Sequence, residues 1–177
     1  MLKKLIPMLC LLIPACGGGI PYGLKAVDGF DVSRYLGTWY EIARLDHSFE
    51  RGLTNVTAEY IARDDGGIDV LNKGYDRVKL KWKEARGRAY FTGEKTRGML
   101  KVSFFRPFYG GYNILALDKD NYSYSLICGP DKAYLWILAR TKKLDDRSIA
   151  KLVTVADSLG FATDKLIMVD HIDVENK

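Results

Sequence analysis

The stretch Tyr35–Arg44 reads YLGTWYEIAR, a glycine followed by residues with high strand propensity. Bulky aromatic and β-branched side chains pack well on a pleated surface, so we expect a strand over Thr38–Arg44. Similar short runs, separated by turn residues, recur along the chain. The other seven are Asn55–Ile61, Ile68–Tyr75, Lys79–Arg88 continued through Phe91, Met99–Phe105, Tyr112–Leu117, Tyr122–Cys128 and Tyr134–Arg140. Eight antiparallel strands can close an up-and-down barrel with room for one small ligand, so we predict an all-β fold.

One segment departs from the strand pattern, because its apolar residues recur at helical spacing. These residues are Ile149, Leu152, Val153, Ala156 and Leu159. Asp145 and Asp146 precede the stripe, where acidic side chains can cap a helix and suit its dipole. Gly160 stands where a glycine commonly ends a helix. We therefore expect one C-terminal amphipathic helix packed on the outside of the barrel, followed by a short strand over Lys165–Val169.

Two motifs carry a resemblance to a known family. Gly37–Glu41 reads GTWYE, and about a hundred residues later Leu135–Arg140 reads LWILAR. These motifs resemble the first and last signatures of the lipocalins, and the resemblance implies that Arg140 lies across Trp39 as a structural pair that closes one end of the barrel. A guanidinium group stacked on an indole ring gains about 1–2 kcal/mol when both are desolvated.

The resemblance extends from about Phe30 to Val169. The strings DDGG (64–67), FFRPFYGGYN (104–113) and CGP (128–130) closely resemble bacterial lipoprotein members of the family. The chain departs from the second lipocalin signature, commonly Thr-Asp-Tyr, because it carries Gly110 and Gly111 before Tyr112. The signature therefore does not predict the loop geometry at these two glycines.

The N-terminus divides the chain into three parts. Residues 1–15 combine a basic start with a short apolar run and resemble a bacterial lipoprotein signal peptide. Cleavage would expose Cys16 for modification by diacylglycerol and further acyl chains such as palmitate; the alternative is an ordinary signal peptide and an incidental thiol. Residues 16–27 are Gly-rich and predict a flexible tether, and residues 28–177 form the lipocalin domain. Gly17 follows the cysteine in place of the usual inner-membrane retention signal Asp, which favours the outer membrane with the domain facing the periplasm.

Strand alternation predicts which side chains face the barrel interior, starting from Trp39, Tyr112 and Arg140. The predicted cavity residues are Leu100, Val102, Phe104, Tyr112, Ile114, Ala116, Tyr134, Trp136 and Leu138. The same alternation turns Glu41 inward, where a carboxylate is costly without a partner; it either pairs with a basic or Tyr side chain or twists outward. The basic run Lys79–Arg88 is interpreted as a solvated face, with a positive rim for lipid headgroups as the alternative.

An apolar, elongated cavity and the bacterial resemblance together favour a membrane-tethered carrier of fatty acids or lysophospholipids. The net charge of +5, or +3 without Lys3 and Lys4, is too modest to indicate nucleic-acid binding. The chain lacks a nucleophile elbow, a phosphate loop and a metal-spaced Cys/His cluster, so we expect neither an enzyme nor a metal or other cofactor. The alternatives are a lipocalin-fold enzyme acting on lipids, a haem or pigment binder using His47, His171 or a tyrosine, and a filled scaffold barrel. Homodimerisation is left open.

Overall fold

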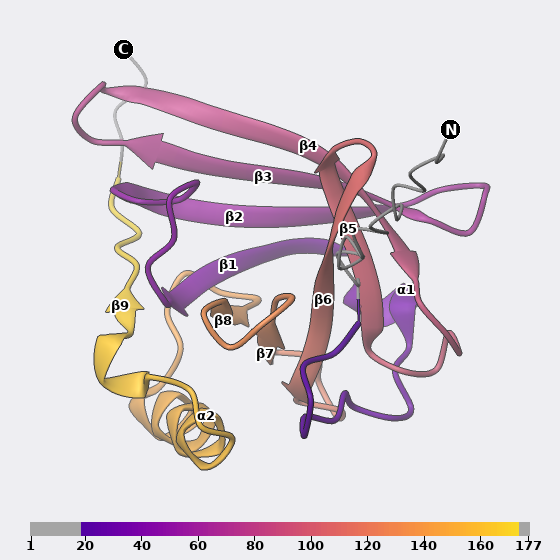
Figure 1. The fold of residues 1–177 in the computed structure, drawn as a ribbon. Coiled ribbons are helices and arrows are strands. Elements are labelled where there is room, and N and C mark those ends of the chain that lie inside the picture. The colour runs from indigo at the N-terminus through magenta and orange to yellow at the C-terminus, as the bar shows by residue number, and fades with distance from the viewer. Residues whose placement is uncertain (1–18, 174–177) are drawn as a thin grey trace, which may run out of the picture.

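The computed structural model describes residues 19–173, and Figure 1 shows a closed barrel with one helix beside it. The signal-peptide and Cys16 predictions lie outside the described residues. The strands are β1 (Gly37–Arg44), β2 (Leu53–Ala62), β3 (Ile68–Asp76), β4 (Lys81–Phe91), β5 (Met99–Phe105), β6 (Phe108–Leu117), β7 (Tyr124–Cys128), β8 (Leu135–Ala139) and β9 (Ile167–Met168). The helices are α1 (Val32–Tyr35), α2 (Asp146–Ser158) and the short 3₁₀ turn η1 (Thr163–Lys165).

The first eight strands form the barrel. Each pairs antiparallel with the next along the chain, and β1 closes the circle by pairing with both β8 and β2. Strand β9 adds to the end of β1 through Ala43 and Arg44. The predicted eight-stranded antiparallel barrel is therefore confirmed. No helix within residues 19–173 is long and apolar enough to cross a membrane.

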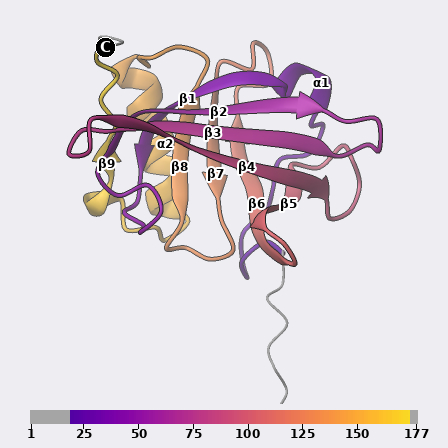
Figure 2. The same cartoon turned by 90° about the horizontal axis from the view of Figure 1, so that it is seen from above.

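Helix α2 packs on the outside of the barrel, as Figures 1 and 2 show. The Asp145 side chain caps it by accepting a hydrogen bond from the Ser148 amide at 2.9 Å. Gly160 adopts a positive φ of 80°, and the next amide, that of Phe161, donates back to the Ala156 carbonyl. The buried face of the helix, with Leu152 and Ala156, rests on outward side chains of β7, β8 and β1. Both predicted helix ends are thus confirmed.

One end of the barrel is closed by Trp39 and Arg140. The Trp39 ring is completely buried, and its Nε1 donates to the carbonyl of Tyr35 in α1 at 2.8 Å. The Arg140 guanidinium lies 4.0 Å from the centroid of this ring and donates to the carbonyls of Thr38 and Arg34. Helix α1, which the sequence pattern did not predict, covers the same end. The other end, where the β1–β2, β3–β4, β5–β6 and β7–β8 connections lie, is the mouth.

Most predicted strand limits differ from the structure by at most two residues, but the start of β6 differs by four. Strand β6 begins at Phe108, not at Tyr112, so Gly110 and Gly111 belong to the strand and not to a turn. The pairing of Val102 with Gly110 and of Phe105 with Phe108 extends the strand to this point. Glycine at position 111 is explained by close packing, because a Cβ atom there would lie 2.8 Å from the Gly19 carbonyl oxygen. The first described residues therefore cross β6 at a place where only glycine leaves room.

Candidate ligand-binding cavity

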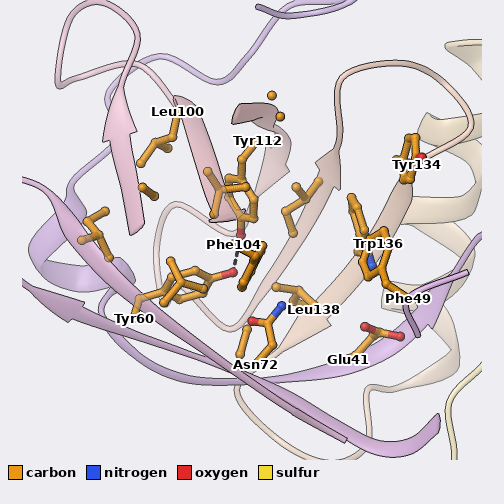
Figure 3. Close-up of a pocket in the computed structure, with 18 of the residues that line it drawn as sticks. Glu41, Phe49, Tyr60, Asn72, Leu100, Phe104, Tyr112, Tyr134, Trp136 and Leu138 are labelled. Carbon is orange, nitrogen blue, oxygen red and sulfur yellow. Dashed lines mark hydrogen bonds between the residues drawn. The ribbon is translucent and has the colours of Figure 1, made fainter. Parts of the chain in front are cut away.

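The barrel holds a cavity of about 410 Å³, within the range of small-molecule sites. Figure 3 shows its wall, to which all strands of the barrel contribute. Most of the lining is aromatic or aliphatic. The apolar residues include Phe30, Val56, Ala58, Ile68, Val70, Ala89, Leu100, Val102, Phe104, Ile127 and Leu138. A wall of this composition favours a ligand with a hydrocarbon body, because burying such a ligand removes apolar surface from water on both sides.

The structure places seven of the nine sequence-predicted cavity residues on this wall, namely Leu100, Val102, Phe104, Tyr112, Tyr134, Trp136 and Leu138. Ile114 also points into the barrel, but it is completely buried among closed-end residues and does not line the cavity. The prediction for Ala116 is wrong, because this residue packs on the outside of the barrel, in the hydrophobic cluster beneath helix α2. The register of β6 with β7 shifts between Ile114 and Ala116, and Leu115 is the extra residue. This bulge turns Ala116 outward, because it interrupts the alternation of side chains.

The sequence reasoning missed the part of the wall formed by β2 and β3. Val56, Ala58 and Tyr60 on β2 face the cavity, as do Val70 and Asn72 on β3. Both sets alternate with outward residues and could have been assigned by the same rule, once β1 was paired with β2. The Asn72 Oδ1 atom is buried and has no hydrogen-bond partner among the described residues. Its amide is therefore available to a polar group on a ligand.

Three tyrosines form the floor of the cavity. The Tyr112 hydroxyl lies 2.8 Å from the hydroxyls of both Tyr35 and Tyr60, and Figure 3 shows the second of these contacts. Burial raises the pKa of Tyr35 to about 12, and it holds the pKa values of Tyr60 and Tyr112 well above their ordinary value. The three side chains are thus neutral, and their hydroxyls satisfy one another. The floor presents mostly ring surface to a ligand.

A network of charged and aromatic side chains lies near the mouth. Glu41 is buried and faces the cavity, and the Arg44 Nη1 atom donates to its carboxylate at 2.7 Å. The sequence left open whether Glu41 pairs with another side chain or twists outward. In the structure Glu41 faces inward and pairs with Arg44 on its own strand. Glu50, also on the cavity wall, accepts a hydrogen bond from Trp136 Nε1 at 3.0 Å and lies 3.0 Å from His47 Nε2.

The two carboxyl groups of this network have pKa shifts of opposite direction. Burial raises the pKa of Glu41 well above its ordinary value, and the neighbouring Glu50 carboxylate raises it further against the effect of Arg44. Burial also acts to raise the pKa of Glu50, but the hydrogen bonds from His47 and Trp136 outweigh it, so that the Glu50 pKa is lowered. The lowered pKa keeps Glu50 ionised near neutral pH, so its carboxylate places a negative charge on the cavity wall.

The remaining candidates lie away from the cavity wall. Residues of the basic run Lys79–Arg88 are mostly exposed, and several pair with carboxylates, as Lys83 does with Asp76 at 2.9 Å. Neither histidine lines the cavity: His47 stacks on Phe49, and His171 Nε2 lies 2.8 Å from the Glu41 carbonyl oxygen. No group of three His, Cys, Asp or Glu side chains within residues 19–173 is placed to hold a metal ion.

Comparison with known protein families identifies the family to which the chain belongs. The family model described as a lipocalin-like domain matches residues 30–171. The chain belongs to the lipocalin family. This lipocalin is 51% identical over 174 residues to the outer membrane lipoprotein Blc of Escherichia coli (strain K12), a match that covers 95% of this chain and 98% of that protein. The outer membrane lipoprotein Blc of Vibrio cholerae is 50% identical, with 96% and 99% covered.

More distant relatives match in sequence or in structure. Mouse apolipoprotein D is 32% identical over 151 residues, which cover 81% of this lipocalin and 78% of that protein. Among solved structures, insecticyanin from the tobacco hornworm superposes with a TM-score of 0.69 at 23% identity, with 88% of each chain covered. At this identity the structural likeness supports the fold alone.

Proposed function

We propose that this lipocalin is a lipid-binding lipoprotein of the outer membrane, which holds a fatty acid or a lysophospholipid in the barrel and is anchored through an acylated Cys16. One observation carries the proposal: the cavity is apolar along its wall, closed at one end by Trp39 and Arg140 and open at the other. Such a site accepts an acyl chain and leaves the polar headgroup at the mouth.

The relatives support the location and the anchor. Two bacterial proteins about half identical over nearly the whole length bear the name outer membrane lipoprotein. The segment that precedes Gly17 has the order of a lipoprotein signal peptide followed by Cys16. Several acyl chains on one cysteine would hold the protein firmly at a membrane, because one chain alone gives only marginal binding. We therefore propose a binding protein that works beside the membrane that contains its ligand, and not an enzyme.

Native mass spectrometry of residues 17–177, followed by lipid extraction, tests the ligand. We expect a co-purified fatty acid or lysophospholipid, and added lysophospholipid should bind to emptied protein. Val102 lines the cavity, whereas its neighbour Lys101 on the same strand does not. Val102→Trp should fill the cavity and weaken binding tenfold or more, while the matched control Lys101→Trp should bind as the unchanged protein does.

An emptied protein that binds neither lysophospholipid nor fatty acid would overturn the proposal. Equal binding by the two Trp variants would show that lipid binds outside the barrel and would also contradict it. Thermal melting of both variants establishes that each is folded. The same native spectra report whether two copies associate, and hence whether this lipocalin forms a homodimer.

A further inference from the structure

Large aromatic side chains are exposed around the mouth. Phe105 is 76% exposed, Phe108 67% and Phe49 57%, although all three also contribute to the cavity wall. The rings of Phe105 and Phe108 stack with their centroids 6.3 Å apart at the β5–β6 turn. We call these three residues the aromatic rim. Exposed apolar side chains that gather in one place mark a surface that meets an apolar partner.

The start of the described chain lies at the same end of the barrel. The Gly19 carbonyl is 3.5 Å from Asn113 Nδ2, and it lies against Gly111, which also packs beside Pro130 of the β7–β8 connection. Figure 1 shows this start beside β6. The position of Gly19 therefore determines which end of the barrel a lipid on Cys16 can reach.

The length of the tether excludes the closed end. Cys16 precedes Gly19 by three positions in the chain, which span at most about 11 Å. Along β6, Phe108 lies three residues from Gly111 toward the mouth, about 10 Å, whereas Leu117 lies six residues toward the closed end, about 20 Å. An acylated Cys16 can thus reach the level of the aromatic rim but falls short of the closed end. A membrane that holds this lipid faces the mouth or the barrel wall next to it.

The charge of the rim agrees with a phospholipid surface. Arg106 follows Phe105 in the β5–β6 turn and is exposed. A cation among exposed aromatic rings suits the boundary of a bilayer, because the rings lie at the apolar edge while the guanidinium contacts anionic headgroups.

We propose that the aromatic rim docks on the bilayer, with Phe105 and Phe108 in the headgroup boundary, so that the cavity opens directly onto the membrane. A lipid could then enter the barrel without its acyl chain crossing water. The inference rests on the acylated Cys16 of the proposed function. It adds an orientation and an entry route that binding in the cavity does not require.

Depth-dependent fluorescence quenching tests the docking. The full lipidated chain is incorporated into vesicles of phosphatidylethanolamine and phosphatidylglycerol that contain brominated phosphatidylcholine, with unbrominated lysophospholipid added to fill the cavity. Phe105→Trp reports on the rim. Lys119→Trp is the control, because Lys119 is exposed in the β6–β7 connection at the closed end, where its carbonyl accepts a hydrogen bond from Arg34. After subtraction of the signal of the native tryptophans, Trp emission from position 105 should be quenched at least twofold more than emission from position 119.

Equal quenching at the two positions would overturn the docking. Emission from position 105 that changes with protein concentration but not with bromination would assign the rim to contact between two copies, and would overturn it too. The intact mass shows whether Cys16 is acylated, and an unmodified cysteine would overturn both proposals. A rim that is quenched in a protein that retains no lipid would refute the carrier function and leave the docking supported.

Discussion

Replacing Arg140 with methionine tests how much the closing pair stabilises the barrel. The Arg140 guanidinium lies 4.0 Å from the Trp39 ring centroid and donates at 2.9 Å and 2.7 Å to the carbonyls of Thr38 and Arg34. The cation–π contact contributes about 1 kcal/mol. Each charge-assisted hydrogen bond contributes about 1 kcal/mol at this half-buried position. Methionine keeps an apolar stem over the indole but loses all three contacts, so Arg140→Met should lower the free energy of unfolding by about 3 kcal/mol.

Urea unfolding followed by tryptophan fluorescence measures this loss, and thermal melting should show a decrease of about 6–12 °C for a domain of this size. Arg51→Met is the matched control. Arg51 pairs with Asp46 at 2.6 Å on the surface, where solvent screens the pair, so this variant should leave the unfolding midpoint nearly unchanged. If Arg140→Met lowers the free energy of unfolding by less than about 1 kcal/mol, the contacts of Arg140 with Trp39 and the two carbonyls do not stabilise the closed end as proposed.

Two further predictions concern the cavity floor and the acid stability. Tyr112→Phe leaves the hydroxyls of Tyr35 and Tyr60 without their shared partner, so it should cost about 1–3 kcal/mol in urea unfolding, and a smaller effect than this would contradict the described network. Hydrogen bonds from the Lys79 amide and from Lys83 lower the pKa of Asp76 to about 2. A lowered pKa means that Asp76 stabilises the fold above pH 4 and that this stability is lost as the pH falls from about 4 to 2. Asp76→Asn should therefore make the urea midpoint depend less on pH between about 4 and 2. A pH dependence equal to that of the unchanged protein would refute the stabilising role of Asp76.

Local sequence predicted most of the barrel, because each strand is indicated by residues of high strand propensity and by the turn residues at its ends. Strand β5 occupies the predicted Met99–Phe105, and the limits of α2 follow from Asp145 and Gly160. Helix α1 escaped prediction since its four residues are too few to show a periodicity. The early start of β6 was not predicted either, because glycine usually indicates a turn. The segment that crosses Gly111 begins at Gly19, far away in the sequence.

The candidate cavity was predictable only in part. Alternation assigns one face of a strand correctly until a bulge intervenes, and the bulge at Leu115 therefore misplaced Ala116. The sequence left two possibilities for Glu41. Arg44 became its partner because the register of β1 with β8 shifts between Glu41 and Ala43, an irregularity that no local pattern signals.

The sequence by itself determined the strand order, the outer helix, the family motifs and the apolar character of the interior, since these follow from alternation, turn chemistry and residue type. Only the tertiary structure decided the size of the cavity, the tyrosine floor, the Glu50 network and the shared location of the aromatic rim and Gly19. Each of these joins residues that are far apart in the chain, such as Tyr60 with Tyr112 and Glu50 with Trp136. Their contacts depend on how strand tilt, bulges and barrel closure bring distant side chains together, and such geometry is a property of the whole packed barrel.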